Sequence, residues 1–188
     1  MNTIPKTEKF YTNWAKSAQP IYRNKRFTLL EKDDFHVVEY HKKQVIILPI
    51  LENNSIIMPK VKRQILGGAT WELPAGGICG KESEEECALR ELREETGISI
   101  FDTSLLNKET TLIVSQNRLP MFPSIFSIVV GLNEFDQRNP HDHEVDSVGS
   151  FTLDEIKEMI ITGQILTSIT ISILARFLLS KEISFLKN

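Results

Sequence analysis

The chain has 188 residues, of which 41% are hydrophobic and 25% are charged, and its net charge is −3. This composition predicts a soluble globular protein of one ordinary domain, with room for a small appendage, and excludes a disordered chain. The slight negative charge gives no support for general binding to nucleic acid or to an anionic membrane. No apolar run approaches the ~20 residues that a bilayer-spanning helix needs. We therefore expect neither nucleic acid nor a membrane among the partners.

The two cysteines, Cys79 and Cys87, are too few for a disulfide framework and lack the paired spacing of a zinc site. We interpret both as reduced thiols, with Cys87 packed inside a helix. The N-terminal sequence has no apolar core of the kind that a secretory signal contains. These features together lead us to expect a cytoplasmic protein.

The first third of the chain reads as β-structure. Residues 21–42 suggest two short strands around an acidic turn at Lys32–Asp34. The apolar run at 45–50 predicts a strand that is covered on both faces. A turn at Glu52–Asn54 then predicts a hairpin into the strand SIIMPKV, because Asn tolerates the left-handed conformation.

A Gly-rich stretch separates these strands from a strong helix, which is expected from Ser83 to Thr96 and is stopped by Gly97. The pattern Thr152-Leu-Asp-Glu155 predicts a capping box that opens another helix. The remaining expected elements are strands at 111–114, 125–132 and 145–151, a proline-containing loop between the first two, and helices ending at 161 and covering 168–181. This order predicts an α+β fold with a mixed sheet between helices, and not a doubly wound fold.

The expected helix after the Gly-rich stretch carries paired carboxylates. Glu91 and Glu95 are four residues apart, so their side chains can converge one helical turn apart. Arg90 and Glu94 form a second such pair beside them and can make an ion pair. Converging carboxylates repel each other if they are only solvated, whereas Mg²⁺ prefers one or two carboxylates together with substrate phosphates. A solvated charged helix and a magnesium site are both compatible with this spacing alone.

The glycines before the helix favour the second interpretation. Gly76, Gly77 and Gly80 allow the backbone to turn sharply and to approach a ligand closely. A carbonyl such as that of Ala75 could then face the metal, and backbone N–H groups near the start of the helix could hold phosphate oxygens.

The whole segment resembles the Nudix box of the Nudix hydrolase superfamily, G-x5-E-x7-R-E-U-x-E-E-x-G-U, where U is a bulky aliphatic residue. The matching positions in this chain are Gly76, Glu82, Arg90, Glu91, Leu92, Glu94, Glu95, Gly97 and Ile98. The resemblance implies a Nudix α/β/α sandwich. It also implies hydrolysis of a nucleoside diphosphate linked to another group, by attack of water on phosphorus.

The same resemblance implies a role for each matched position. Glu91, Glu95 and the Ala75 carbonyl would ligate Mg²⁺, which Mn²⁺ can replace. Glu94 would be a further or water-bridged contact to the metal. Glu82 and Arg90 would support the site.

Flanking sequence resembles the branch of ADP-ribose and nucleoside-diphosphate-sugar pyrophosphatases, through WELPAGGI at the start of the box and the basic strand MPKVKRQI before it. Similarity to this branch extends loosely over nearly the whole chain. By this resemblance the candidate substrate-binding residues are Arg63, Lys60, Glu72, Gly76 and Gly77. Arg63 could instead be a surface residue at a strand end, and Glu72 could equally be a structural hydrogen-bond partner.

The catalytic base in that branch is a glutamate on a late loop, which here is NPHDHEVDS. Glu144 is the first choice by its Glu-Val-x-x-Val pattern, and Asp142 is the second. His141 and His143 leave two other possibilities open, a histidine base and a transition-metal pair.

Residues 1–44 resemble the small N-terminal β domain of this branch, which is exchanged across a homodimer and helps to bind the nucleobase, while 45–188 would form the Nudix hydrolase domain. Tyr22 and Phe27 are possible stacking residues, although packing is the commoner fate of such aromatics. Trp71 is expected to pack and not to bind the base. The implied partners are a small nucleotide substrate and a second copy of the chain.

Two departures from the branch leave the substrate open. A proline that is usual about 16 residues beyond the box is absent, since this position falls in VSQNR. Leu166-Thr167 also replaces the acidic residue that is usual after the C-terminal Gly-x-Ile. The leading substrate is ADP-ribose or a similar nucleotide sugar such as GDP-mannose. The alternatives are a house-cleaning nucleoside triphosphate pyrophosphatase and a sensor that binds ADP-ribose without turnover.

Overall fold

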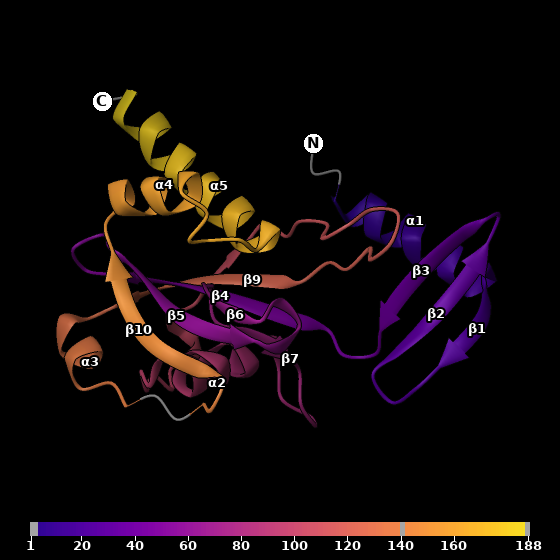
Figure 1. Ribbon diagram of the computed structural model, residues 1–188, viewed down its shortest axis with the longest axis horizontal. Helices are drawn as coiled ribbons and strands as arrows, with labels where there is room; N and C mark the ends of the chain where they lie inside the picture. The colour runs from indigo at the N-terminus through magenta and orange to yellow at the C-terminus, as the bar shows by residue number, and fades with distance from the viewer. Residues whose placement is uncertain (1–3, 140–141, 187–188) are drawn as a thin grey trace.

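The computed structural model describes residues 4–139 and 142–186, and within them the strands form a three-stranded sheet and a seven-stranded mixed sheet (Figure 1). The strands are β1 (Gln19–Arg23), β2 (Phe27–Lys32), β3 (Phe35–Tyr40), β4 (Gln44–Leu51), β5 (Ile56–Arg63), β6 (Gly68–Trp71), β7 (Ala75–Gly77), β8 (Asn107–Glu109), β9 (Ser124–Val130) and β10 (Val145–Phe151). The helices are α1 (Ile4–Ser17), α2 (Glu84–Thr96), α3 (Leu132–Asp136), α4 (Leu153–Ile161) and α5 (Ser168–Leu186), with short 3₁₀ turns η1 (Gln64–Leu66) and η2 (Thr103–Leu105).

The larger sheet runs in the order β10-β5-β4-β9-β8. Its centre is the parallel pair of β4 and β9, which are in register from Val45 opposite Ser124 to Leu51 opposite Val130. Most of β4 is buried, as the apolar run at 45–50 predicted, because helices cover both faces of the sheet at this point.

The segment that carries β6 and β7 follows β5 in the sequence, lies between β4 and β5 in the sheet, and positions the candidate site. The two strands meet at the expected hairpin turn, where Asn54 has a φ of 66° and Ile50 lies opposite Ile56. Farther from the turn they separate, so that β5 pairs with β6 and β4 pairs with β7. The chain from Gly68 to Gly77 therefore fills the gap between the two central strands, and Ala75 lies beside Ile46 of β4.

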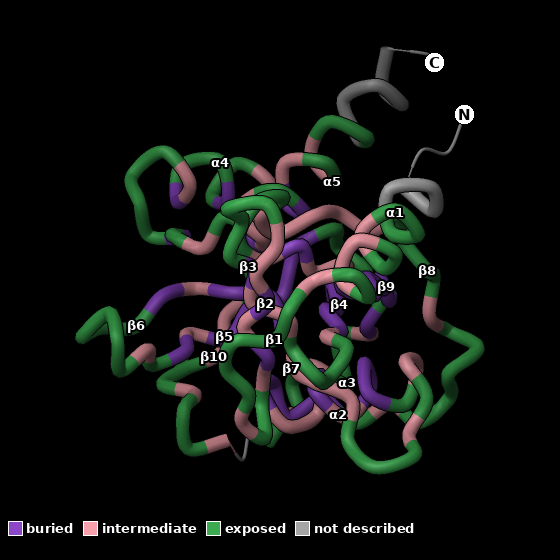
Figure 2. Tube along the Cα trace, turned by 90° about the vertical axis from the view of Figure 1, so that its right-hand side faces the viewer, coloured by how far each residue is buried: buried purple, intermediate pink, exposed green. Residues whose placement is uncertain are grey.

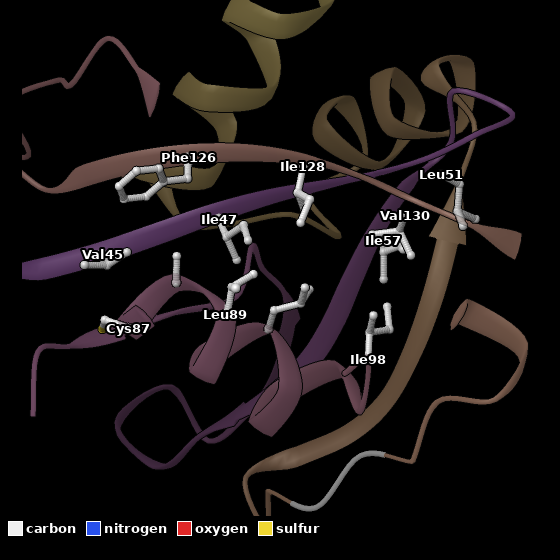
Figure 3. Packing of buried hydrophobic residues seen from close by; sticks show 12 residues of the cluster. Val45, Ile47, Leu51, Ile57, Cys87, Leu89, Ile98, Phe126, Ile128 and Val130 are labelled. Carbon is white, nitrogen blue, oxygen red and sulfur yellow. The ribbon is translucent and has the colours of Figure 1, made fainter. Parts of the chain in front are cut away.

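Helices pack on the two faces of this sheet and make it the middle layer of a sandwich. Helix α2 covers one face, and α4 and α5 cover the other (Figure 1). On the α2 side, Leu89 and Cys87 point from the helix toward Val45 and Ile47 of β4 (Figure 3). The predicted α+β fold with a mixed sheet between helices is confirmed. No helix within the described residues has both the length and the apolar character needed to cross a bilayer.

The N-terminal sheet lies to one side of the sandwich (Figure 1), and its strand β1 is exposed along its whole length, whereas β4 in the larger sheet is mostly buried (Figure 2). The acidic turn was predicted correctly, since Asp33 and Asp34 adopt positive φ values between β2 and β3. Strand β1 and helix α1 were not expected. Helix α1 carries Tyr11, whose ring packs at a tilt against Phe122 of the long loop before β9, with a ring-centroid distance of 6.3 Å.

The strand expected at 111–114 was wrong. The segment that pairs with β9 is β8, which ends at Glu109, and the chain then leaves the sheet. The Val114 N–H donates to the carbonyl of Met121, and Ser115 pairs with Leu119, so the segment folds back on itself instead of joining the sheet. The strand expected at 125–132 ends at Val130, because Gly131 begins α3. The last helix was predicted correctly at its start, but it extends to Leu186.

Candidate active site

Helix α2 carries the acidic residues of the predicted site. Its start is fixed by a capping box, in which the Ser83 hydroxyl accepts from the Glu86 N–H and the Glu86 carboxylate accepts from the Ser83 N–H. Its end is Gly97, whose φ of 77° is the left-handed conformation that glycine adopts without strain. Complete burial of Cys87 and Leu92 fixes the rotation of the helix about its axis, and with it the direction of the carboxylates.

The side chains of Glu91 and Glu95 both lie against strand β7 and are each only 8% exposed as residues. The Ala75 N–H donates to Glu95 Oε2 over 3.3 Å. A Cβ at Gly76 would overlap the Glu91 carboxylate, so the close approach of this side chain to the backbone requires glycine. The structure thus brings together Ala75, Gly76 and the two glutamates, as predicted from the box.

Arg90 ties the Gly-rich turn to the helix. Its Nε and Nη2 atoms donate to the Glu82 carboxylate over 3.0 and 2.8 Å, and Nη2 also donates to the Gly77 carbonyl over 3.1 Å. Its Nη1 atom contacts Glu94 at 2.8 Å and Glu91 at 2.7 Å. The Arg90 guanidinium holds the pKa of Glu82 at about 2, and these carboxylates in turn raise the pKa of Arg90. The supporting role predicted for Glu82 and Arg90 agrees with this geometry.

The paired glutamates are electrostatically unfavourable in the absence of a cation. Burial raises the pKa of Glu95 to about 8, and the neighbouring Glu91 charge adds to this rise, while the Ala75 N–H opposes it. Burial also raises the pKa of Glu91, against the opposing charge of Arg90. A cation between the two carboxylates would offset this cost, because burying a charge is expensive unless it is paired or coordinated.

The donor set fits a magnesium ion that completes its coordination with waters and substrate. Among residues 4–139 and 142–186, no three His, Cys, Asp or Glu side chains lie close enough to form a metal-binding cluster. The candidate set is therefore two carboxylates and a backbone oxygen, and Glu94 is engaged by Arg90. Mg²⁺ retains several waters and takes one or two carboxylates plus substrate phosphates, which suits such an open set.

A second group of charges stands across from α2 and comes from β5, the β6–β7 connection and the loop before β10. Arg63 forms a bidentate salt bridge with Glu72, in which Nε donates to Oε1 over 2.9 Å and Nη2 donates to Oε2 over 2.7 Å. Its remaining nitrogen, Nη1, lies 3.9 Å from Glu144. The charges of Glu95 and Glu144 also contribute to the raised pKa of Arg63. The structure therefore groups three of the predicted residues into one chain of contacts, next to the paired glutamates.

The loop that carries the candidate bases is held by its own backbone. The Glu144 N–H donates to Asp142 Oδ1 over 2.8 Å, and the Lys62 N–H donates to the Glu144 carbonyl over 2.8 Å. The Glu144 side chain is 65% exposed. Asp142 is close enough for its charge to raise the pKa of Glu95. His141, one half of the possible metal-binding pair, lies outside the described residues.

The other predicted contacts lie at the margin of the site. Lys60 stands over the ring of Trp71, 5.8 Å from its centroid. Trp71 packs edge-on against Phe151 at 4.7 Å, which confirms the prediction that it packs. In the N-terminal sheet, the rings of Tyr22 and Phe27 pack against each other at a tilt, with their centroids 5.8 Å apart.

A clamp at the start of α2, formed by Glu84, Lys43 and Lys108, was not predicted from the sequence. Glu84 accepts from Lys43 at 2.5 Å and from Lys108 at 2.8 Å, which ties the helix to the residue before β4 and to β8. These contacts lower the pKa of Glu84 to about 2, although burial opposes the shift. No local pattern could have revealed this clamp, because its three residues come from separate parts of the chain.

The fold is a mixed sheet between helices, and one helix holds two buried carboxylates against a glycine turn. A family model for the NUDIX domain matches residues 40–166, which is more than half of the chain. The chain belongs to this family.

Curated relatives include the phosphatase NudJ of Escherichia coli K12 and that of Shigella flexneri, each 31% identical over 96 residues. The match covers 51% of this chain and 60% of each relative, so the chain matches less than two thirds of their length. A crystal structure of an ADP compounds hydrolase superposes with a TM-score of 0.64 at 18% identity, and the match covers 89% of this chain and 92% of the other. The latter likeness is one of fold.

Proposed function

We propose that this chain is a Mg²⁺-dependent Nudix hydrolase that cleaves the pyrophosphate bond of ADP-ribose or a similar nucleoside diphosphate sugar. The products would be a nucleoside monophosphate and a sugar phosphate. The observation that carries the proposal is the pair of buried carboxylates, Glu91 and Glu95, held against Ala75 and Gly76. The structural neighbour is a hydrolase of ADP compounds, which supports this substrate class.

The residues of the chain have distinct roles in this proposal. Glu91, Glu95 and the Ala75 carbonyl hold the metal, for which Mn²⁺ can substitute. When bound, Mg²⁺ neutralises phosphate charge and lowers the pKa of a coordinated water. Arg90, bound to Glu82 and Glu94, keeps the glycine turn fixed on the helix, so that the ligands are already in position before substrate arrives.

Arg63 and Lys60 are the proposed phosphate contacts, with Glu72 fixing the Arg63 guanidinium. Gly76 and Gly77 let the pyrophosphate approach the backbone closely. Glu144 accepts a proton from the attacking water as the general base. Its exposure leaves room for a water between its carboxylate and the substrate.

The N-terminal segment, residues 1–44, is proposed to form a homodimer contact and to help bind the nucleobase. Ile21, Tyr22, Phe35 and Tyr40 leave a large part of their apolar surface exposed on its small sheet. Light scattering during gel filtration tests the dimer, and a monomer at micromolar concentration would refute it. The free thiols of Cys79 and Cys87 suit a reducing compartment, so we place the protein in the cytoplasm.

The deciding experiment is hydrolysis of a substrate panel by the full chain, with Mg²⁺ and with chelator. The panel contains ADP-ribose, GDP-mannose, UDP-glucose, NADH, diadenosine polyphosphates and nucleoside triphosphates, and Glu95→Gln serves as the matched inactive control. We expect metal-dependent cleavage confined to diphosphate-linked substrates. Preferred cleavage of triphosphates would support the house-cleaning alternative. Tight binding of ADP-ribose without turnover would make the chain a sensor.

A further inference from the structure

A hollow of about 550 Å³ lies on the solvent side of α2. Its helical wall contains Glu86, Leu89 and Arg93, which recur at the spacing that places residues on one face of a helix. The opposite wall is the segment after Gly97, which runs back along the helix until Lys108 contacts Glu84. This hollow is on a different face of α2 from the one that holds Glu91 and Glu95 against β7.

The charges that are free to meet a ligand in this hollow are positive. Glu82 is engaged by Arg90 and by the Cys79 N–H, and Glu86 accepts from the Ser83 N–H. The side chains of Lys81 and Arg93, by contrast, form no hydrogen bond or ion pair within the described part of the chain. Two cations without an ionic partner, beside acids that are already engaged in hydrogen bonds, favour an anionic ligand, and an arginine also presents a planar guanidinium to phosphate oxygens.

An exposed aromatic ring stands beside these cations. Phe101 is 76% exposed, although the neighbouring Ile100 packs against the core. A large ring left in water next to free cations is suited to a ligand that has both a planar ring and a negative charge, because aromatic stacking contributes about 1–3 kcal/mol per nucleobase. Lys81 lies before the start of α2 and Arg93 in its last turn, so the helical rise separates them by roughly 15 Å along the axis. A single phosphate can therefore pair with only one of the two cations.

We propose that this hollow binds a free nucleotide, with its base stacked on Phe101 and its phosphate paired with Arg93. The site is separate from the proposed catalytic carboxylates, and it requires no metal. Its floor includes Glu82 and Arg90, the pair that fixes the Gly-rich turn, so a bound nucleotide contacts the rear of the proposed active site.

The test is a titration of the full metal-free chain with AMP in the presence of chelator. Binding is monitored in ¹H–¹⁵N correlation spectra. We expect the amides of Phe101 and Thr103 to shift in a saturable way. Phe101→Ala and Arg93→Ala should each weaken this binding about tenfold. Phe10→Ala is the matched aromatic control, since Phe10 is 75% exposed on α1, and Lys16→Ala is the helical cation control; both should bind AMP as the parent does.

Adenosine and inorganic phosphate separate the two parts of the proposal. Each should bind more weakly than AMP and shift the same amides. Shifts confined to the residues around Gly76, or AMP binding that is unchanged in both variants, would overturn the proposal. It would also be overturned if phosphate alone bound as tightly as AMP, because the ring would then contribute nothing. None of these outcomes depends on hydrolytic activity.

Discussion

Replacement of Gly76 by alanine tests the geometry on which the proposed catalytic site depends. A Cβ at this position would overlap the Glu91 carboxylate, whose Oε2 would be 2.6 Å away. Real Cβ contacts essentially never fall below 3.0 Å, so the carboxylate must withdraw. Its nearer oxygen must retreat by about 1 Å, and a displacement of this size at a reacting group costs on the order of 100-fold in rate. That factor corresponds to about 2.7 kcal/mol of activation free energy.

The assay is kcat/KM for ADP-ribose at saturating Mg²⁺, together with thermal unfolding to establish that the variant is folded. Gly68→Ala is the matched control, because a Cβ at Gly68 meets nothing within 4 Å. We expect the control to keep the parental rate and Gly76→Ala to lose about two orders of magnitude with little loss of stability. If Gly76→Ala hydrolysed ADP-ribose at the parental rate, Glu91 would not need its position against β7, and its assignment as a metal ligand would fail.

Three further predictions concern the charged groups. Burial raises the folded-state pKa of Glu95 to about 8, so the contribution of its protonated form to stability is fully present below its unfolded pKa and is lost as the pH rises through 8. Urea unfolding without metal should therefore show a lower free energy of unfolding at high pH. Glu95→Gln should lessen this loss of stability while removing most activity. Arg90→Ala should lower the free energy of unfolding by about 2 kcal/mol, because Glu82 loses charge-assisted hydrogen bonds. Arg90→Lys should restore little of this free energy in the same urea titration, since lysine lacks the planar guanidinium that binds a carboxylate through two nitrogens. Glu144→Gln should reduce kcat by about 10²–10⁴-fold with little change in KM, whereas Asp142→Asn should not; a reversed result would make Asp142 the base.

Local sequence was sufficient to predict α2 and what it carries. Its capping box, its left-handed terminal glycine and the spacing of Glu91 and Glu95 all follow from interactions within one or two helical turns. The buried strand β4 was predictable for a similar reason, since a run of apolar residues with no polar alternation requires cover on both faces.

Local sequence failed where pairing partners are distant. The segment at 111–114 has strand-like composition, but β8 pairs with the available edge of β9. No local signal shows which segment will pair with that edge. Helix α1 was not predicted, although Phe10, Tyr11 and Trp14 have helical spacing.

The sequence by itself determined the family, the pairing of Glu91 with Glu95 and the residues that contact them, because helix periodicity and a fixed motif are short-range properties. Tertiary structure alone decided that Arg63 is held by Glu72 and stands near Glu144, and that Lys43 and Lys108 converge on Glu84. These groups come from different strands and loops. Their meeting depends on the separation of β4 and β5 and on the order of strands in the sheet, which are set by long-range packing and hydrogen bonding that no short window of sequence contains.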